Sequence, residues 1–240
     1  MDLSTLFLPV RRIEADPMTV AEYEADQWPG TLPPVRQLLR EGLDLGPVTV
    51  LTGQNGTGKS TVLEALAMAY GMNPEGGSTG AMHVTRPSES SLHEQLKLIR
   101  GAAASRKGFF LRAETMHSFY SYLEESRFRT SLHERSHGES ILELIQERLP
   151  TVRGLWLFDE PESALSMRSC IELVHLMQRA IQNGSQVVIS THSPVLAAFP
   201  GAQIYQLSDT GYELVDYDRL ELVTGWRSFL ADPAGHFSGR

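Results

Sequence analysis

The stretch GQNGTGKST at residues 53–61 constrains the fold of this chain more than any other feature. It satisfies the pattern G-x-x-x-x-G-K-[ST], in which a glycine-rich loop turns its backbone N–H groups toward phosphate oxygens. The alternative interpretation is a glycine-rich turn that carries a surface lysine. If the stretch is a phosphate-binding loop, the candidate nucleotide-binding residues are Gly53, Gln54, Asn55, Gly56, Thr57, Gly58, Lys59, Ser60 and Thr61.

The flanking residues favour the phosphate-binding loop, because such a loop needs a buried strand before it and a helix after it. Residues 47–53, PVTVLTG, form a β-branched apolar run typical of a central strand in a parallel sheet. Residues 59–71, KSTVLEALAMAYG, place apolar side chains on one helical face and end at a glycine. We therefore expect a site in which Lys59 reaches the β- and γ-phosphates and the Ser60 hydroxyl ligates Mg²⁺.

Length and composition favour a single α/β domain that spans residues 1–240. Alternating strand and helix patterns predict a mainly parallel sheet flanked by helices, with ligands at the carboxyl ends of its strands. The net charge of −8 supplies no chain-wide basic field for nucleic acid, and it leaves DNA binding open. The single cysteine cannot form an internal disulfide, and no apolar run is long enough to span a membrane. We expect a cytoplasmic protein.

Shorter patterns predict the remaining elements. Residues 72–90 are rich in glycine, serine and proline and are typical of a surface loop. In chain order we also expect an edge strand at 5–10 with a proline-rich loop to about 35, a helix at 91–103, a strand at 108–114, a helix at 116–128, strands at 153–160 and 185–192, and a hairpin over 202–217.

A second signature is the apolar strand in GLWLFDEPESAL, residues 154–165, which ends in two carboxylates. Asp159 stands at the strand end, where it would bind Mg²⁺ directly or through water. Glu160 follows it and points elsewhere because strand side chains alternate, so Glu160 is the candidate general base for an attacking water. The alternative interpretation of DEPES is an acidic helix start that favours the helix dipole.

A third signature is VVISTHSP, residues 187–194, in which another strand ends at His192. A lone histidine is more often structural than catalytic, and the hydroxyl residues beside it suit a helix start before Pro194. Its position favours function, because this strand is expected beside the strand that ends at Asp159. A neutral imidazole there could hydrogen-bond the γ-phosphate and register its loss.

A fourth signature is SHGES at residues 136–140, which precedes an apolar helical pattern that extends to residue 149. As local structure it is an N-capped amphipathic helix. Its hydroxyl and backbone N–H groups also make a second anion site, for which the same subunit offers no phosphate partner. The candidate nucleotide-binding residues in this stretch are Ser136, Gly138 and Glu139.

Together these motifs resemble the ABC-type ATPase superfamily, over roughly residues 45–208. The order is phosphate loop, signature, Walker B strand, D-loop (SALS, residues 163–166) and switch histidine. The first residue of the signature lies 23 residues before the Walker B aspartate, and that aspartate lies 33 residues before the histidine, both close to the spacing of the superfamily. The resemblance implies a P-loop NTPase fold with a helical insertion and signature region at about 72–150.

The details are similar to the soluble branch of predicted ATPases related to SMC, RecF and OLD-type heads. Asn55 in the loop, DEPE in place of DEPT, THSP, and SHGES in place of LSGGQ separate the chain from typical transporter subunits. The Q-loop glutamine has no obvious counterpart, because FFLRAE places Arg112 and Glu114 there, and Glu114 is the candidate substitute near Mg²⁺. Only 77 residues separate Lys59 from Ser136, too few for a long coiled-coil arm.

The resemblance implies an enzyme that binds and hydrolyses Mg-ATP in a head-to-tail dimer and drives an unidentified protein partner. In this scheme Glu160 polarises water, Lys59 and Mg²⁺ offset charge, and His192 senses the γ-phosphate. Trp28 and the pair Arg11 and Arg12 are the candidates for contact with the adenine ring. Two alternatives stay open: the ATP-binding subunit of a membrane transporter, and a RecF-like DNA-repair ATPase.

Overall fold

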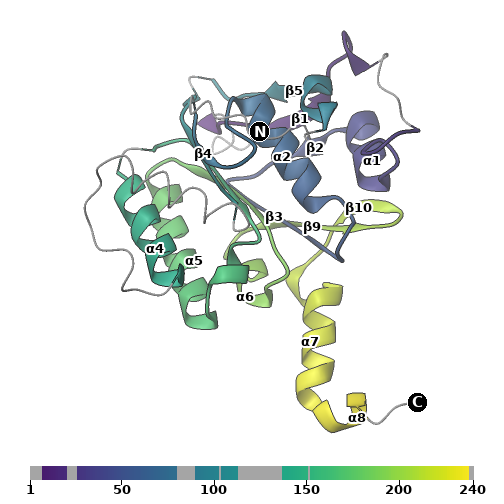
Figure 1. Cartoon of the computed structure of the whole chain (residues 1–240), viewed down its shortest axis with the longest axis vertical. Coiled ribbons are helices and arrows are strands. Elements are labelled where there is room, and N and C mark those ends of the chain that lie inside the picture. The colour runs from purple at the N-terminus through teal and green to yellow at the C-terminus, as the bar shows by residue number, and fades with distance from the viewer. Residues whose placement is uncertain are drawn as a thin grey trace.

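The computed structural model describes residues 7–20, 26–79, 90–102, 104–112, 137–150 and 152–237, and it confirms the predicted α/β class (Figure 1). Within these residues a seven-stranded sheet has the order β10-β9-β3-β8-β7-β6-β4. The five strands from β9 to β6 run parallel, and β10 and β4 pair antiparallel at the two edges. The strands are β3 (Val48–Gly53), β4 (Gly77–Ser78), β6 (Gly108–Arg112), β7 (Leu155–Asp159), β8 (Gln186–Ser190), β9 (Gln203–Ser208) and β10 (Gly211–Leu214).

Helices cover both faces of this sheet, and the side-chain alternation of β7 shows why. Leu155 and Leu157 join the apolar cluster around α2, whereas Trp156 and Phe158 join the cluster around α4 and α5. All four side chains are fully buried, as expected for a central parallel strand. The helices are α1 (Pro33–Glu41), α2 (Lys59–Tyr70), α4 (His137–Arg148), α5 (Met167–Gln182), α6 (Pro194–Ala197), α7 (Glu221–Ala231) and α8 (Pro233–Phe237).

A second, three-stranded antiparallel sheet has the order β2-β1-β5 and consists of β2 (Leu43–Asp44), β1 (Arg12–Ala15) and β5 (Leu96–Ile99). The buried Gln186 side chain in β8 ties the chain leading into this sheet to the main sheet. Its Oε1 accepts a hydrogen bond from the Val10 N–H at 2.9 Å, and its Nε2 donates to the carbonyls of Val10 at 2.6 Å and Gly46 at 2.9 Å.

Several sequence predictions are wrong in detail. The helix expected at 91–103 is a short 3₁₀ turn (Ser91–Gln95) followed by β5, because the pairing of β5 with β1 overrides the local helical pattern. The first described strand is β1 at Arg12–Ala15, in the small sheet, and not an edge strand at 5–10 of the main sheet. The proline-rich loop contains α1, which begins with two prolines at the helix start, where a missing N–H costs nothing.

Other predicted elements are confirmed, and one lies outside the described residues. The strands near 47–53, 108–114, 153–160 and 185–192 are confirmed, as is the terminal hairpin of β9 and β10. The helix expected at 116–128 lies outside the described residues. No helix in the described part of the chain is both long and apolar enough to cross a membrane.

Candidate functional site

The phosphate-loop motif lies where β3 ends and α2 begins, as the sequence predicts. Gly58 caps the start of α2 with φ of 95°, in the left-handed region that favours glycine. Gly53 has φ of 142°, and a Cβ there would lie 2.2 Å from the Leu207 carbonyl oxygen on β9. These two glycines are therefore required by backbone conformation and by close packing, and the 3% exposure of Lys59 contradicts the surface lysine of the alternative interpretation.

The Lys59 side chain folds back over this loop. Its Nζ donates to the carbonyls of Gly53 and Gln54, each at 3.0 Å, and the residue is only 3% exposed. Burial lowers the pKa of Lys59, and the nearby carboxylates of Glu160 and Asp159 oppose that shift. The ammonium group is thus held at the loop by neutral carbonyl oxygens, which a phosphate anion can outcompete as partners for a cation.

Two of the three predicted Mg²⁺ ligands, Ser60 and Asp159, are in direct contact. Ser60 Oγ donates to Asp159 Oδ1 at 3.0 Å, although the residues are 99 positions apart in the chain. Asp159 is 5% exposed, and burial raises its pKa while the Ser60 hydrogen bond and the Arg112 charge oppose the rise. A hydroxyl and a carboxylate oxygen side by side fit Mg²⁺, which takes one or two protein ligands and completes its shell with phosphates and water.

Arg112 lies in the stretch where a Q-loop counterpart is expected from the sequence. The strand register sets Arg112 beside Asp159, with Arg112 Nε 3.6 Å from Asp159 Oδ2. Its Nη1 donates to Glu64 Oε2 on α2 at 2.8 Å. The position next to the predicted metal ligand Asp159 is therefore filled by a guanidinium group, while Glu114, the predicted substitute ligand, lies outside the described residues.

Glu160 has the most unusual backbone of the described residues that are not glycine, with φ of 47° and ψ of 49°. Its N–H donates to the Ser190 carbonyl at 2.9 Å, and its own carbonyl accepts from the Ser163 N–H and hydroxyl at 3.1 and 2.9 Å. A left-handed glutamate costs about 1–3 kcal/mol, and such strain clusters at functional sites. The strand therefore stops at Asp159, and the left-handed turn redirects the next carboxylate.

His192 lies beside that carboxylate, with Nε2 3.3 Å from Glu160 Oε1. The two residues meet because β7 and β8 pair directly, with Asp159 opposite Ser190, as the sequence predicts. Glu162, which the motif analysis did not single out, accepts a hydrogen bond from the His192 N–H at 2.5 Å. No sequence pattern pointed to this contact, because it joins a 3₁₀ turn (Pro161–Ala164) to the end of another strand.

A cavity of about 370 Å³ opens over the loop, and Trp28 stands at it with 59% of its surface exposed. Of the three candidates for adenine contact, Trp28 alone lines this cavity. Arg12 instead pairs with Glu14 and Asp44 in the small sheet, each at 2.8 Å. The lining residues are Trp28, Leu32, Asn55, Gly56, Gly58, Lys59, Ser60, Thr61 and Glu160.

The signature stretch is described only in part. Ser136 lies outside the described residues, and Gly138 and Glu139 fall in the first turn of α4, where the structure gives the backbone alone. The rest of α4 confirms the predicted amphipathic helix, because it buries Ile141, Leu142, Leu144 and Ile145 against α5 and the sheet.

Comparison with known proteins gives two family-model matches and several distant relatives. A family model described as "AAA domain" matches residues 36–146, and a second, described as "AAA domain, putative AbiEii toxin, Type IV TA system", matches residues 140–198. The motif-based resemblance to AAA/ABC-type P-loop ATPase domains is thereby confirmed.

Two curated relatives carry ABC-type or import names. A hemin import ATP-binding protein of Rhodopseudomonas palustris is 26% identical over 63% of this chain and 67% of its own length. An uncharacterized ABC transporter ATP-binding protein of Haemophilus influenzae is 25% identical over 76% of this chain and 77% of its own length. Among solved structures, the SMC head domain from Thermotoga maritima is 13% identical, with a TM-score of 0.44 over 73% of this chain and 93% of that chain.

Proposed function

Because the chain carries a P-loop ATPase domain of the AAA/ABC type, we propose that it binds and hydrolyses Mg-ATP in a head-to-tail dimer and thereby drives a protein partner. One observation carries the proposal: two segments distant in the chain meet here, because Lys59 and Ser60 line one cavity with Glu160, and Ser60 contacts Asp159. A structural glycine turn would not need a buried lysine and two carboxylates at the same point. We place the activity in the cytoplasm, where ATP is supplied.

The residues at the site divide the chemistry between them. Lys59 exchanges its carbonyl partners for phosphate oxygens, and Ser60 and Asp159 hold Mg²⁺, which stabilises charge on the phosphates when bound. Glu160 accepts a proton from the attacking water, and its turned backbone aims it away from the metal ligands. His192, held at its N–H by Glu162, contacts the γ-phosphate and reports its loss.

The Trp28 ring is the proposed support for the adenine base. It stands at the same cavity as the phosphate loop, more than half exposed, and an exposed aromatic face beside a nucleotide site suits stacking. Phosphates on the loop and a base on Trp28 would then occupy the same cavity.

The dimer completes the site from the other side. In this proposal Ser136, Gly138 and Glu139 of one chain face the γ-phosphate bound to the other chain. Groups supplied in trans to a transferring phosphoryl group are worth roughly 10³–10⁵ in rate, so the monomer should be nearly inactive. Glu139 is compatible with this place only if its carboxylate faces backbone or ribose, because phosphate would repel it.

The test is the variant Glu160→Gln, which keeps the shape of the side chain and removes its basicity. We expect this chain to bind ATP without hydrolysing it and to accumulate as a dimer with Mg-ATP, observed by analytical ultracentrifugation. The matched control Glu213→Gln makes the same charge change at an exposed position of β10. This variant should hydrolyse ATP at the wild-type rate. A Glu160→Gln chain that stays monomeric at saturating Mg-ATP contradicts the proposal.

A second candidate function is suggested by the relatives, one of which is named as an import protein. In that case the chain would energise a membrane permease. Co-purification of the ATP-locked Glu160→Gln chain with an integral membrane protein, compared with the nucleotide-free chain, would favour this candidate over a soluble partner.

A further inference from the structure

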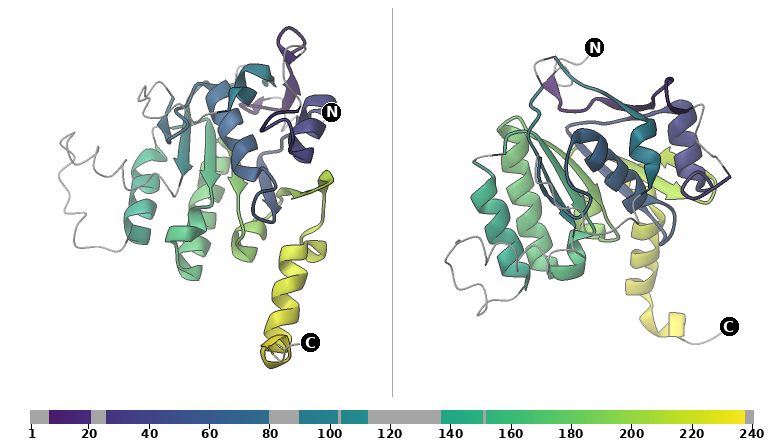
Figure 2. Two further views of the ribbon diagram at one scale, coloured as in Figure 1. Left: turned by 45° about the vertical axis from the view of Figure 1, so that its right-hand side comes forward. Right: turned by 45° about the horizontal axis from the view of Figure 1, so that its top comes forward.

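The C-terminal arm, defined here as α7 and α8, extends away from the rest of the molecule (Figures 1 and 2). It begins beside α6, which follows the carboxyl end of β8, and it extends beyond that end of the sheet. Of the helix α7, only Val223 is buried. The arm therefore projects on the side of the molecule where the nucleotide site lies.

The arm carries an apolar stripe that is covered at its base and bare toward its tip. Val223, Trp226 and Leu230 follow each other at helical spacing, and their exposed fractions are 2%, 47% and 67%. Phe229 contributes to the same surface and packs edge-to-face on Trp226 and on Phe237, which is 79% exposed. The amphipathic pattern of α7 thus continues beyond Val223, the last α7 residue that is buried against the rest of the protein.

A helix of this kind needs a covering surface. An isolated helix of 11 residues is marginal in water, and most helical stability in proteins comes from packing an apolar face. Gly225 lowers the intrinsic helix propensity of α7 further. The sequence of α7 therefore indicates a helix that is completed by contact with another surface.

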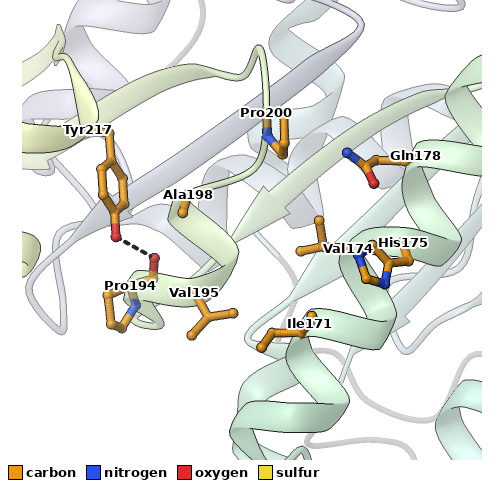
Figure 3. Close-up of a pocket in the computed structure, with 9 residues that line it drawn as sticks. All are labelled: Ile171, Val174, His175, Gln178, Pro194, Val195, Ala198, Pro200 and Tyr217. Carbon is orange, nitrogen blue, oxygen red and sulfur yellow. Dashed lines mark hydrogen bonds between the residues drawn. The ribbon is translucent and has the colours of Figure 1, made fainter.

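The same chain offers a bare apolar groove between α5 and α6, with a volume of about 450 Å³ (Figure 3). Ile171 and Val174 line it from α5, and Val195 and Ala198 line it from the α6 side. Tyr217 joins the groove to the root of the arm, because its hydroxyl donates to the Pro194 carbonyl at 3.1 Å. The groove therefore lies next to the root of the arm.

We propose that two copies of this chain exchange their arms, so that the apolar stripe of each α7, together with Phe237 of α8, lies against the α5–α6 groove of the other copy. The inference rests on the proposed dimer and adds a second contact to it. Both bare surfaces lie toward the end of the sheet that the nucleotide-dependent dimer would close. A two-fold axis at that end of the sheet would place each arm against the groove of the other copy, so that both arms and both grooves are covered.

The area involved favours a second copy over an unrelated small partner. Covering the exposed parts of Trp226, Leu230 and Phe237 removes on the order of 300–400 Å² per arm from water, given the size of such side chains. With an equal area on each groove, two exchanged arms bury roughly 1,200–1,600 Å², which reaches the range of stable interfaces, whereas one arm in one groove reaches about half.

Cross-linking between two differently marked chains tests the exchange. One chain carries Leu230→Cys, the other carries Gln178→Cys in the groove, and both carry Glu160→Gln so that Mg-ATP holds the dimer. A short bismaleimide should yield a covalent heterodimer on a denaturing gel. Leu230→Cys mixed with a chain carrying Lys97→Cys, on the exposed face of β5, should yield none, and the native Cys170 is buried and does not contribute.

A charge in the stripe gives an independent measurement. Leu230→Glu should raise the dissociation constant of the ATP-held dimer by about tenfold or more, because it places a charge in an apolar contact. Thr224→Glu, at an exposed position of α7 away from the stripe, should leave the constant unchanged.

The outcomes separate the two proposals. A dimer with Mg-ATP that shows neither the cross-link nor the Leu230→Glu effect overturns arm exchange and leaves the proposed function intact. A third sample is a single chain that carries both Leu230→Cys and Gln178→Cys. If the cross-link forms only within that chain and never between two chains, arm exchange is also overturned. No dimer at all overturns the proposed function, and arm exchange with it.

Discussion

At the scale of single residues, the site is made from groups that the fold holds under unfavourable conditions. Burial opposes the charge of Lys59 and of Asp159, and Glu160 adopts a left-handed backbone that few residues other than glycine accept. Each buried charge and the left-handed backbone lower the free energy of unfolding of the nucleotide-free protein. They are explained if phosphate and Mg²⁺ supply the missing partners when the nucleotide binds.

The strain at Glu160 can be measured by comparing two variants that both lack the carboxylate. Glycine accepts a φ of 47° without steric cost and alanine does not. We expect Glu160→Gly to unfold in urea with a free energy about 1 kcal/mol higher than Glu160→Ala, even though glycine usually destabilises a folded chain. Equal stability of the two variants, or a more stable alanine variant, would show that the left-handed turn is not present.

At the scale of elements, the site depends on how strand ends are held together. The pairing of β7 with β8 brings Glu160 and His192 within 3.3 Å, and β6 beside β7 adds Arg112. Gln186, at the start of β8, anchors the chain before β1 and the chain before β3 through three hydrogen bonds. One buried side chain thus connects the small sheet to the large one.

Replacing Gln186 by Met should therefore cost far more than a typical substitution. The change keeps the volume and removes the partners of buried backbone groups, each of which costs about 1–3 kcal/mol when left unsatisfied. We expect a loss of roughly 2–5 kcal/mol in the free energy of unfolding, measured by urea denaturation. Gln182→Met, at the exposed end of α5, should change it by less than about 0.5 kcal/mol.

Which elements the sequence predicts depends on what stabilises them. The strands around the site are apolar on both faces, and the phosphate loop has fixed spacing, so local patterns suffice for β3, β7 and β8. The strand β5 and the arm escaped prediction, because β5 depends on pairing with β1 and α7 follows what looked like a terminal hairpin. Glu162 escaped because it acts through one contact between segments distant in the chain.

At the scale of the whole molecule, the proposed nucleotide site lies at an exposed cavity, and the described residues include an arm with an exposed apolar stripe. A single copy has Lys59, Ser60 and Glu160 at one cavity, and the proposed trans groups begin at Ser136. Both features are accounted for by the same two-fold assembly. The central claim is accordingly that two chains complete each other's nucleotide site.

The most direct measurement mixes two inactive variants. Lys59→Ala disables the phosphate loop and leaves the signature intact, whereas Ser136→Arg disables the signature and leaves the loop intact. Each alone should fail to hydrolyse ATP. In a two-fold dimer a mixed pair has one complete site, so an equal mixture should recover about a quarter of wild-type ATPase activity if pairing is random. A mixture as inactive as its components, or full hydrolysis by Ser136→Arg alone, would contradict the account.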